Sequence, residues 1–215
     1  GTTGNPKGVV YSHRSTFLHT MGAMTVASLG ARESDVICPV VPMFHANAWG
    51  LAHAGVAAGS TLVMPGADLS GPAIADLVVS ERVTVAAGVP TIWMQVLPEL
   101  RGRDTSALRA IPCGGSAVPK ALSEAYREQL GLPILQAWGM TETSPVGLIN
   151  TPTNENQKLS KQKTGRPVWT TQFKIVDENG NDLPQDSTTI GEIYIKGPTV
   201  INSYLKNRSK VVDEE

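Results

Sequence analysis

Five short apolar runs alternate with five amphipathic segments over the first 137 residues, and this pattern restricts the fold more than any other feature of the chain. The apolar runs, each with Val or Ile, span residues 35–41, 60–64, 83–87, 108–113 and 133–137. The helix-compatible segments span about residues 13–30, 47–58, 70–82, 91–100 and 120–130. Strands and helices that alternate with short connections predict an α/β fold with a mostly parallel sheet flanked by helices.

The pattern changes after about residue 150. Residues 151–163 are polar and show no hydrophobic periodicity, which predicts a surface loop. Alternating runs at 172–177 and 191–197 then flank a turn at 178–181, and no helical segment separates them. We therefore expect a small antiparallel β unit, part of a barrel, and a division of the chain into residues 1–150 and 151–215.

Composition excludes several classes of protein. A net charge of −1 gives no support to a nucleic-acid surface, and no apolar stretch reaches the ~20 residues of a membrane span. No signal peptide is visible, so we expect a cytoplasmic protein and leave peripheral membrane association and oligomerisation open. Cys38 and Cys113 show no zinc-ligand spacing and favour two buried thiols, although a disulfide remains an alternative.

The chain begins with Gly1-Thr2-Thr3-Gly4-Asn5-Pro6-Lys7-Gly8. Backbone N–H groups of such a loop can surround an anion, with the Thr hydroxyls and the Lys7 ammonium beside them. The loop differs from the Walker motif, because a Walker loop ends in Gly-Lys-Ser/Thr and leads directly into a helix. A flexible turn is the alternative to a polyphosphate site. Since the first residue is Gly and lies inside this loop, we expect the chain to be an internal fragment of a longer protein.

Three further segments follow predicted strands, where ligands bind in parallel sheets. In Gln136–Thr143, Trp138 offers an indole for stacking, Thr141 a hydroxyl and Glu142 a carboxylate of the kind that binds Mg²⁺. The alternative for this segment is a capped turn with solvated side chains.

The other two segments are Gly114–Ala117 and Phe44–Trp49. The paired glycines would let a flat ligand lie against the backbone, although the segment taken alone favours an ordinary turn before a helix that starts at Val118-Pro119. His45 is a candidate base, and an interior histidine with satisfied hydrogen bonds is the alternative. A hydrolase triad finds no support, because no Ser or Cys has the setting of a nucleophile elbow.

Taken together, these segments resemble the adenylate-forming superfamily, which includes acyl-CoA synthetases, luciferases and the adenylation domains of peptide synthetases. The opening loop resembles its phosphate loop, and Trp138–Glu142 resembles its aromatic-Gly-x-Thr-Glu motif. Gly191–Pro198, continued by Tyr204-Leu205, resembles its Gly-Glu strand motif. The resemblance covers essentially the whole chain. The segments most similar to medium- and long-chain fatty-acyl-CoA synthetases are 40–49, 115–117 and 143–145.

The resemblance implies a two-step reaction. ATP and a fatty acid form an acyl-adenylate and pyrophosphate, and the CoA thiol then forms the thioester. Residues 1–150 would be a partial nucleotide- and acyl-binding subdomain, and 151–215 a partial β-rich subdomain. The implied substrate is a small carboxylic acid, with ATP, Mg²⁺ and CoA taking part in the reaction.

The residue roles are carried over position by position. The implied ATP-binding residues are Gly1, Thr2, Thr3, Gly4, Lys7, Gly114, Gly115, Ser116, Ala117, Trp138, Gly139, Met140 and Thr141. The implied catalytic residues are Thr2, Lys7, His45, Thr141 and Glu142, of which Thr2 and Glu142 would hold Mg²⁺. His45 and Trp49 would face the acyl group. Trp138 departs from the family, which commonly has Tyr at that position.

Other features separate this chain from a complete family member. The family's ribose-binding Thr-Gly-Asp segment, its mobile C-terminal lid and its N-terminal part are not in the sequence, so we expect the isolated chain to make no acyl-CoA at a useful rate. A peptide-synthetase adenylation module is an alternative, but no acid lies between Asp35 and Asp68 to pair with an amino group. A nucleotide-binding homologue without turnover is the other alternative.

Overall fold

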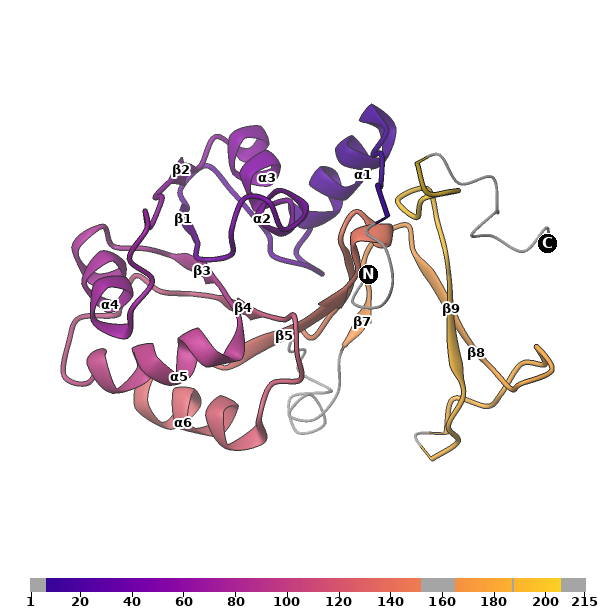
Figure 1. Cartoon of the computed structure of the whole chain (residues 1–215). Helices are drawn as coiled ribbons and strands as arrows, with labels where there is room; N and C mark the ends of the chain where they lie inside the picture. Colours follow the sequence, from indigo (N-terminus) through magenta and orange to yellow (C-terminus); the bar gives the residue numbers. More distant parts are fainter. Residues whose placement is uncertain (1–6, 152–164, 187, 206–215) are drawn as a thin grey trace.

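The computed structural model describes residues 7–151, 165–186 and 188–205 (Figure 1). The helices are α1 His13–Ala23, α2 Ala46–Trp49, α3 Leu51–Ala58, α4 Gly71–Ser80, α5 Pro90–Glu99, α6 Lys120–Leu130 and the 3₁₀ turn η1 Thr141–Thr143. The strands are β1 Val36–Pro39, β2 Thr61–Leu62, β3 Val85–Ala87, β4 Ile111–Cys113, β5 Ile134–Gly139, β6 Val146–Ile149, β7 Arg166–Pro167, β8 Gln172–Val176 and β9 Glu192–Lys196.

The strands from β1 to β5 form the parallel part of the sheet. The hydrogen-bonded order β2-β1-β3 is parallel throughout, and β4 pairs in parallel with β5. Parallel bridges from Val85 to Ala110 and from Gly88 to Cys113 connect β3 to β4. The predicted mostly parallel sheet is therefore confirmed.

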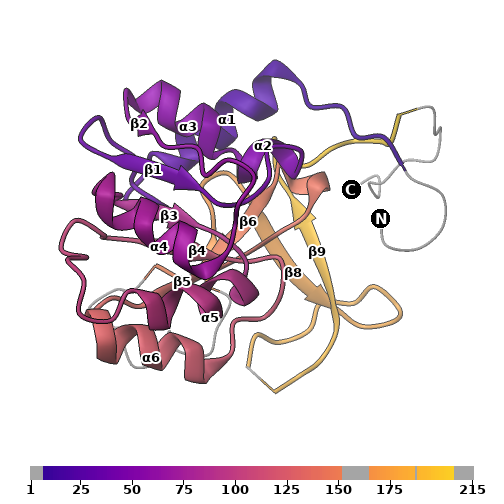
Figure 2. The ribbon, with the colours of Figure 1, turned by 60° about the vertical axis from the view of Figure 1, so that its left-hand side comes forward.

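Helices cover both faces of this sheet (Figure 2). On one face, α4, α5 and α6 pack over a core that includes Trp93 and Tyr126, whose hydroxyl donates to the Trp93 carbonyl at 2.9 Å. On the other face, α1 and α3 pack over a second core, which includes Ile37 and Leu51. Burial on both faces explains why the strand segments are apolar runs rather than alternating patterns.

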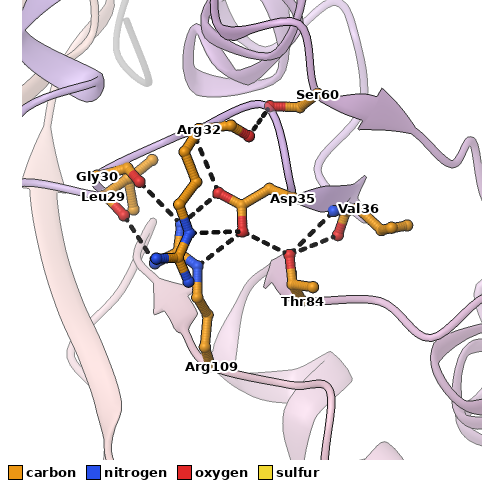
Figure 3. A network of polar contacts seen from close by, with 8 residues as sticks. All are labelled: Leu29, Gly30, Arg32, Asp35, Val36, Ser60, Thr84 and Arg109. Carbon is orange, nitrogen blue, oxygen red and sulfur yellow. Dashed lines mark hydrogen bonds and ion pairs between the residues drawn. The ribbon is translucent and has the colours of Figure 1, made fainter.

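A buried polar network lies at the amino ends of the parallel strands (Figure 3). Asp35, just before β1, is 1% exposed and accepts hydrogen bonds from Arg109, just before β4, and from Thr84, just before β3. Arg109 also donates to the carbonyls of Leu29 and Gly30, at 3.1 and 3.0 Å. The network thus connects the residues that precede β1, β3 and β4 with the turn after α1. It lies at the edge of the sheet opposite to the strands' carboxyl ends.

The chain leaves the parallel pattern at the end of β5. Strand β6 returns antiparallel to β5, and β7 pairs antiparallel with β6. Strands β8 and β9 form a separate antiparallel pair, with Gln172 opposite Lys196 and Val176 opposite Glu192. The expected small antiparallel unit is confirmed, while the boundary at residue 150 stays a prediction. The loop expected at 151–163 lies outside the described residues except for Thr151.

Two helix predictions were wrong in extent. Helix α1 ends at Ala23 rather than near Gly30, and the chain continues through a turn in which the Thr25 N–H and hydroxyl both donate to the Gly22 carbonyl. The helix expected over 47–58 begins only at Leu51. Residues 46–49 form a left-handed turn with φ between 45° and 57°, a conformation that is costly for residues other than glycine.

The β5 prediction was too short, since the strand runs through Trp138 to Gly139 instead of ending at Ala137.

Cys38 and Cys113 are free and buried, as favoured from the sequence. Among residues 7–151, 165–186 and 188–205, none of the helices combines the length and hydrophobicity needed to cross a membrane.

Candidate active site

A cavity of about 240 Å³ lies beyond the carboxyl ends of the parallel strands. Its walls come from the segment after β1, the loop after β4, the end of β5 and the start of β6. The lining residues that the sequence singled out are His45, Trp49, Gly114, Gly115, Trp138, Gly139, Met140 and Thr141. Segments almost 100 residues apart in the sequence therefore share one cavity, as the carboxyl ends of parallel strands should.

Gly114 and Gly115 bring the backbone against neighbouring groups at the end of β4. A Cβ on Gly114 would lie 2.7 Å from the Ala137 carbonyl oxygen and 3.6 Å from Cη2 of Trp49. Gly115 has φ +81°, in the left-handed region that favours glycine. This wall is consequently flat, with one edge formed by the indole of Trp49.

Gly139 has the closest backbone contact in the site. A Cβ there would lie 2.0 Å from the Pro145 carbonyl oxygen, and the register between β5 and β6 shifts between Trp138 and Gly139. The next residue, Met140, donates its N–H to the same Pro145 carbonyl at 3.0 Å. The Trp138 indole meets Phe173 of β8 edge-to-face, with ring centroids 6.0 Å apart. The antiparallel return of β6 therefore fixes the position of Trp138.

Thr141 lines the cavity, whereas Glu142, the next residue of the 3₁₀ turn η1, is not among the lining residues. Thr141 is exposed, and its carbonyl accepts a hydrogen bond from the Tyr11 hydroxyl at 2.7 Å. Glu142 accepts a hydrogen bond from the Tyr204 hydroxyl at 2.5 Å. Partial burial, followed by the charge of Glu142, raises the pKa of Tyr11 to about 12. The pKa of Tyr204 is also raised, and there the main cause is the hydrogen bond to Glu142. Both phenols thus stay protonated as donors at neutral pH.

His45 precedes the left-handed turn and lines the cavity as an exposed side chain. The Phe44 ring lies 5.0 Å from its imidazole, centroid to centroid. The interior histidine considered from the sequence is therefore not what the structure shows. An exposed imidazole at a cavity wall is available to a bound ligand.

The remaining predicted site residues lie elsewhere. Gly1, Thr2, Thr3 and Gly4 lie outside the described residues. Lys7 is exposed, with its ammonium 4.8 Å from the centroid of the Tyr204 ring. Ser116 and Ala117 are exposed and are not among the residues that line the cavity. The roles given to these residues stay predictions.

The sequence did not assign a role to every residue of the site. Ala46, Ala137, Pro145 and Val146 complete the lining. The first three lie in segments that the sequence singled out, and only Val146 was missed. Tyr204 was part of a recognised motif but had no assigned role. Its hydrogen bond to Glu142 spans 62 residues and needs the fold to be known.

A second cavity, of about 20 Å³, adjoins the first and is mostly apolar. It shares Trp49, Ala137 and Val146 with the larger cavity. His19 also lines it and accepts the Val146 N–H at Nε2, 3.2 Å away. Burial, with a further contribution from the charge of His53, lowers the pKa of His19 to about 4. His19 is therefore neutral at physiological pH and behaves as a fixed wall.

Comparison with known proteins places the chain in a family. Residues 1–205 match the AMP-binding enzyme family. The chain belongs to this family. Its relatives in the AMP-binding family include 3-methylmercaptopropionyl-CoA ligase of Ruegeria pomeroyi, which is 43% identical over 215 residues. Medium-chain-fatty-acid–CoA ligase of Ectopseudomonas oleovorans is 41% identical over 214 residues.

These alignments cover nearly all of the chain but less than half of each relative. They include 96% and 95% of the chain, and 40% and 39% of the respective relatives. The chain thus spans about 40% of the length of the curated relatives it matches. A solved long-chain-fatty-acid-CoA ligase from Archaeoglobus fulgidus matches with a TM-score of 0.81 and 27% identity. That match covers 94% of this chain and 42% of the solved chain, which supports the α/β fold described above.

Proposed function

We propose that this chain forms the nucleotide- and acyl-binding part of an ATP-dependent acyl-CoA ligase. One observation carries the proposal: the segments around His45, Gly114 and Trp138, far apart in the sequence, line one cavity beyond the parallel strands. The membership in the AMP-binding enzyme family supports the nucleotide as ligand. The relatives named as CoA ligases support the reaction class.

The cavity suits an adenine nucleotide in shape and chemistry. The backbone at Gly114–Gly115 leaves room for a flat base, and the indole of Trp138 offers an aromatic surface. In the proposal, Ser116 and Ala117 extend this wall beyond the cavity. Thr141, exposed at the rim, contacts the α-phosphate. The opening loop, with Gly1, Thr2, Thr3, Gly4 and Lys7, covers the outer phosphates.

The donors present also fit Mg²⁺. Within the part of the chain that the structure describes, no three His, Cys, Asp or Glu side chains gather into a metal site of their own. Mg²⁺ usually takes only one or two carboxylates, together with water and substrate phosphates. Glu142 would supply the carboxylate and Thr2 a hydroxyl. When bound there, the ion would neutralise charge on the phosphates.

A small apolar cavity of about 20 Å³, with room for about one water-sized group, lies beside the nucleotide cavity. The small cavity adjoins the nucleotide cavity across Trp49, so we propose that the acid's carbon chain passes this indole. His45, exposed on the wall of the larger cavity, then lies near the carboxylate. Orientation of the carboxylate against the α-phosphate is the main contribution of these residues to the first step.

The full reaction converts a small carboxylic acid, ATP and CoA to an acyl-CoA, AMP and pyrophosphate. The relatives' names range from a short thioether acid to medium- and long-chain fatty acids, so we leave the chain length to the test. We place the reaction in the cytoplasm, since buried Cys38 and Cys113 are free thiols. Within the chain, we propose that residues 1–150 hold nucleotide and acyl group and that 151–215 form the β-rich unit.

The test uses the full-length protein that contains this chain. It is incubated with ATP, Mg²⁺ and a panel of acids from 3-methylmercaptopropionate to dodecanoate, and pyrophosphate release and CoA thioester are measured separately. Thioester formation with at least one acid is expected. Adenylation of amino acids without a CoA product would instead identify a peptide-synthetase module. ATP binding without pyrophosphate release would identify a non-catalytic homologue.

A further inference from the structure

The motif that ends in Tyr204-Leu205 is attached to the turn that carries Glu142. The Ile201 N–H donates to the Glu142 carbonyl at 3.0 Å, and the Tyr204 hydroxyl donates to Glu142 Oε1 at 2.5 Å. The Ser144 hydroxyl donates to the Thr199 carbonyl at 2.6 Å. Both the backbone and the carboxylate of Glu142 are therefore held from one segment.

The same segment holds the end of the opening loop. The Leu205 N–H donates to the Gly8 carbonyl at 2.8 Å, and the Lys7 ammonium lies 4.8 Å from the centroid of the Tyr204 ring. At that distance a cation is attracted to the face of an aromatic ring. Tyr204 thus contacts the Glu142 carboxylate with its hydroxyl and the Lys7 ammonium with its ring.

A second phenol ties the loop to the same turn. Tyr11 donates to the Thr141 carbonyl at 2.7 Å. The turn η1 therefore accepts hydrogen bonds from two tyrosines: Tyr11, in the segment after the opening loop, and Tyr204, in the segment after β9. The Tyr204 bond occupies one acceptor position of a carboxylate that has about four, so Glu142 keeps acceptors for a cation.

We propose that Tyr204 is a positioning residue that orients Glu142 toward the metal and Lys7 toward the phosphates. The inference rests on the proposed function. The hydroxyl and the ring act separately: the hydroxyl fixes the carboxylate, and the ring holds the ammonium. Groups that hydrogen-bond to a metal ligand fix its orientation, and their loss weakens metal binding.

The test separates the two parts of the side chain in the full-length protein. Tyr204→Phe keeps the ring and removes the hydroxyl, whereas Tyr204→Leu removes both. Calorimetric titration measures the binding of ATP in EDTA and the binding of Mg²⁺ to the ATP complex. Steady-state assays give the Mg²⁺ concentration for half-maximal rate, and thermal unfolding reports folding. Tyr194→Phe is the matched control, because Tyr194 has Lys174 5.8 Å from its ring centroid but belongs to β9.

For Tyr204→Phe we expect Mg²⁺ binding to weaken about tenfold, at the lower end of the range for outer partners of a metal ligand. ATP binding in EDTA should stay unchanged. Tyr204→Leu should weaken both, and Tyr194→Phe neither. In a Glu142→Ala background, Tyr204→Phe should have no further effect on Mg²⁺ binding, as a shared role requires.

Three outcomes would overturn the inference. The first is an unchanged Mg²⁺ titration in Tyr204→Phe, and the second is tighter Mg²⁺ binding, which would show that the phenol competes with the metal. The third is a parallel loss of Mg²⁺ binding, ATP binding and melting temperature in Tyr204→Phe, which would show a purely structural role of the hydroxyl. If the unsubstituted protein binds no ATP, the proposed function fails together with this inference. If it binds ATP normally, only the role of Tyr204 is at stake.

Discussion

Arg109 holds the Asp35 carboxylate in a two-pronged ion pair, with Nε 2.7 Å from Oδ1 and Nη2 2.5 Å from Oδ2. The carboxylate is 1% exposed, while the Arg109 side chain is 26% exposed. The pair lies at the amino ends of the parallel strands, across the sheet from the candidate active site. Its geometry therefore predicts a role in stability and none in ligand binding.

Asp35→Asn should lower the free energy of unfolding without affecting the nucleotide site. Removing one partner of a fully buried pair costs about 3–5 kcal/mol, and the partial exposure of Arg109 reduces our expectation to roughly 2–3 kcal/mol. Urea denaturation measures the change. Asp104→Asn is the control, because Asp104 pairs with Arg82 at the exposed surface and should show little effect. Equal losses in the two variants would contradict the prediction.

The same pair predicts a pH dependence. Burial alone would raise the pKa of Asp35, but the hydrogen bonds from Arg109 and Thr84 and the Arg109 charge outweigh it and lower the pKa. A carboxylate with a lowered pKa stabilises the fold above its unfolded value, about 3.9, and this contribution is lost as the pH falls through the folded value. The stability difference between the natural chain and Asp35→Asn should therefore shrink below about pH 4.

The fold and much of the site could be predicted because their causes are local. Apolar runs bounded by glycines mark the strands, and parallel strands bring the residues that follow them to one edge. This is why His45, Gly114 and Trp138 could be expected near one another before their coordinates were known. Their meeting depends on strand order, which short connections restrict strongly.

What could not be predicted depends on contacts distant in the sequence or on unusual backbone. No propensity indicates four consecutive positive φ angles over 46–49, which include two alanines and a tryptophan. The return of β6 after Pro145 has no turn signature that separates it from a helix start. Arg109 and Asp35 are 74 residues apart, and only the order of the strands in the sheet brings the residues before β1 and β4 together.

His19 predicts a second pH effect in a different range. Its pKa is lowered to about 4 by burial and by the charge of His53, whereas an unfolded histidine titrates near 6.5. Between these values the unfolded chain binds a proton that the folded chain excludes, so stability should fall as the pH decreases from about 6.5 to 4. The loss amounts to roughly 3 kcal/mol at most, from about 1.4 kcal/mol per pH unit.

His19→Gln isolates this effect. The glutamine keeps an acceptor for the Val146 N–H but removes the titration, so the slope of unfolding free energy between pH 6.5 and 4 should flatten. Urea midpoints across that range provide the measurement. His13→Gln, at an exposed residue of α1, should keep the slope of the natural chain. A slope that persists in His19→Gln would assign the effect to other groups.

Gly114→Ala should impair nucleotide binding more than folding. The added methyl group would lie 2.7 Å from the Ala137 carbonyl oxygen, so the backbone at the cavity wall has to move. Loss of a close-fitting wall should weaken ATP binding roughly tenfold or more, equivalent to about 1.4 kcal/mol. Calorimetry on the full-length protein measures this. Gly22→Ala adds a methyl group at another buried glycine with no atom within 4 Å and should leave ATP binding intact.

Trp49 is the last site residue with a separable effect, because its indole lies on the walls of both cavities. Trp49→Ala would open the nucleotide cavity into the small apolar cavity behind it. Under the proposed function, longer acids should then gain kcat/KM relative to short ones, since each methylene that reaches the new space is worth ~0.8 kcal/mol, or about fourfold. Kinetics over the acid panel measure the ratio. The control is Phe44→Ala, which removes an aromatic side chain from the same segment. Because Phe44 is 84% exposed, its loss should leave chain-length preference unchanged. A uniform loss for all acids in Trp49→Ala would show that the indole supports the nucleotide wall and does not limit the acyl chain.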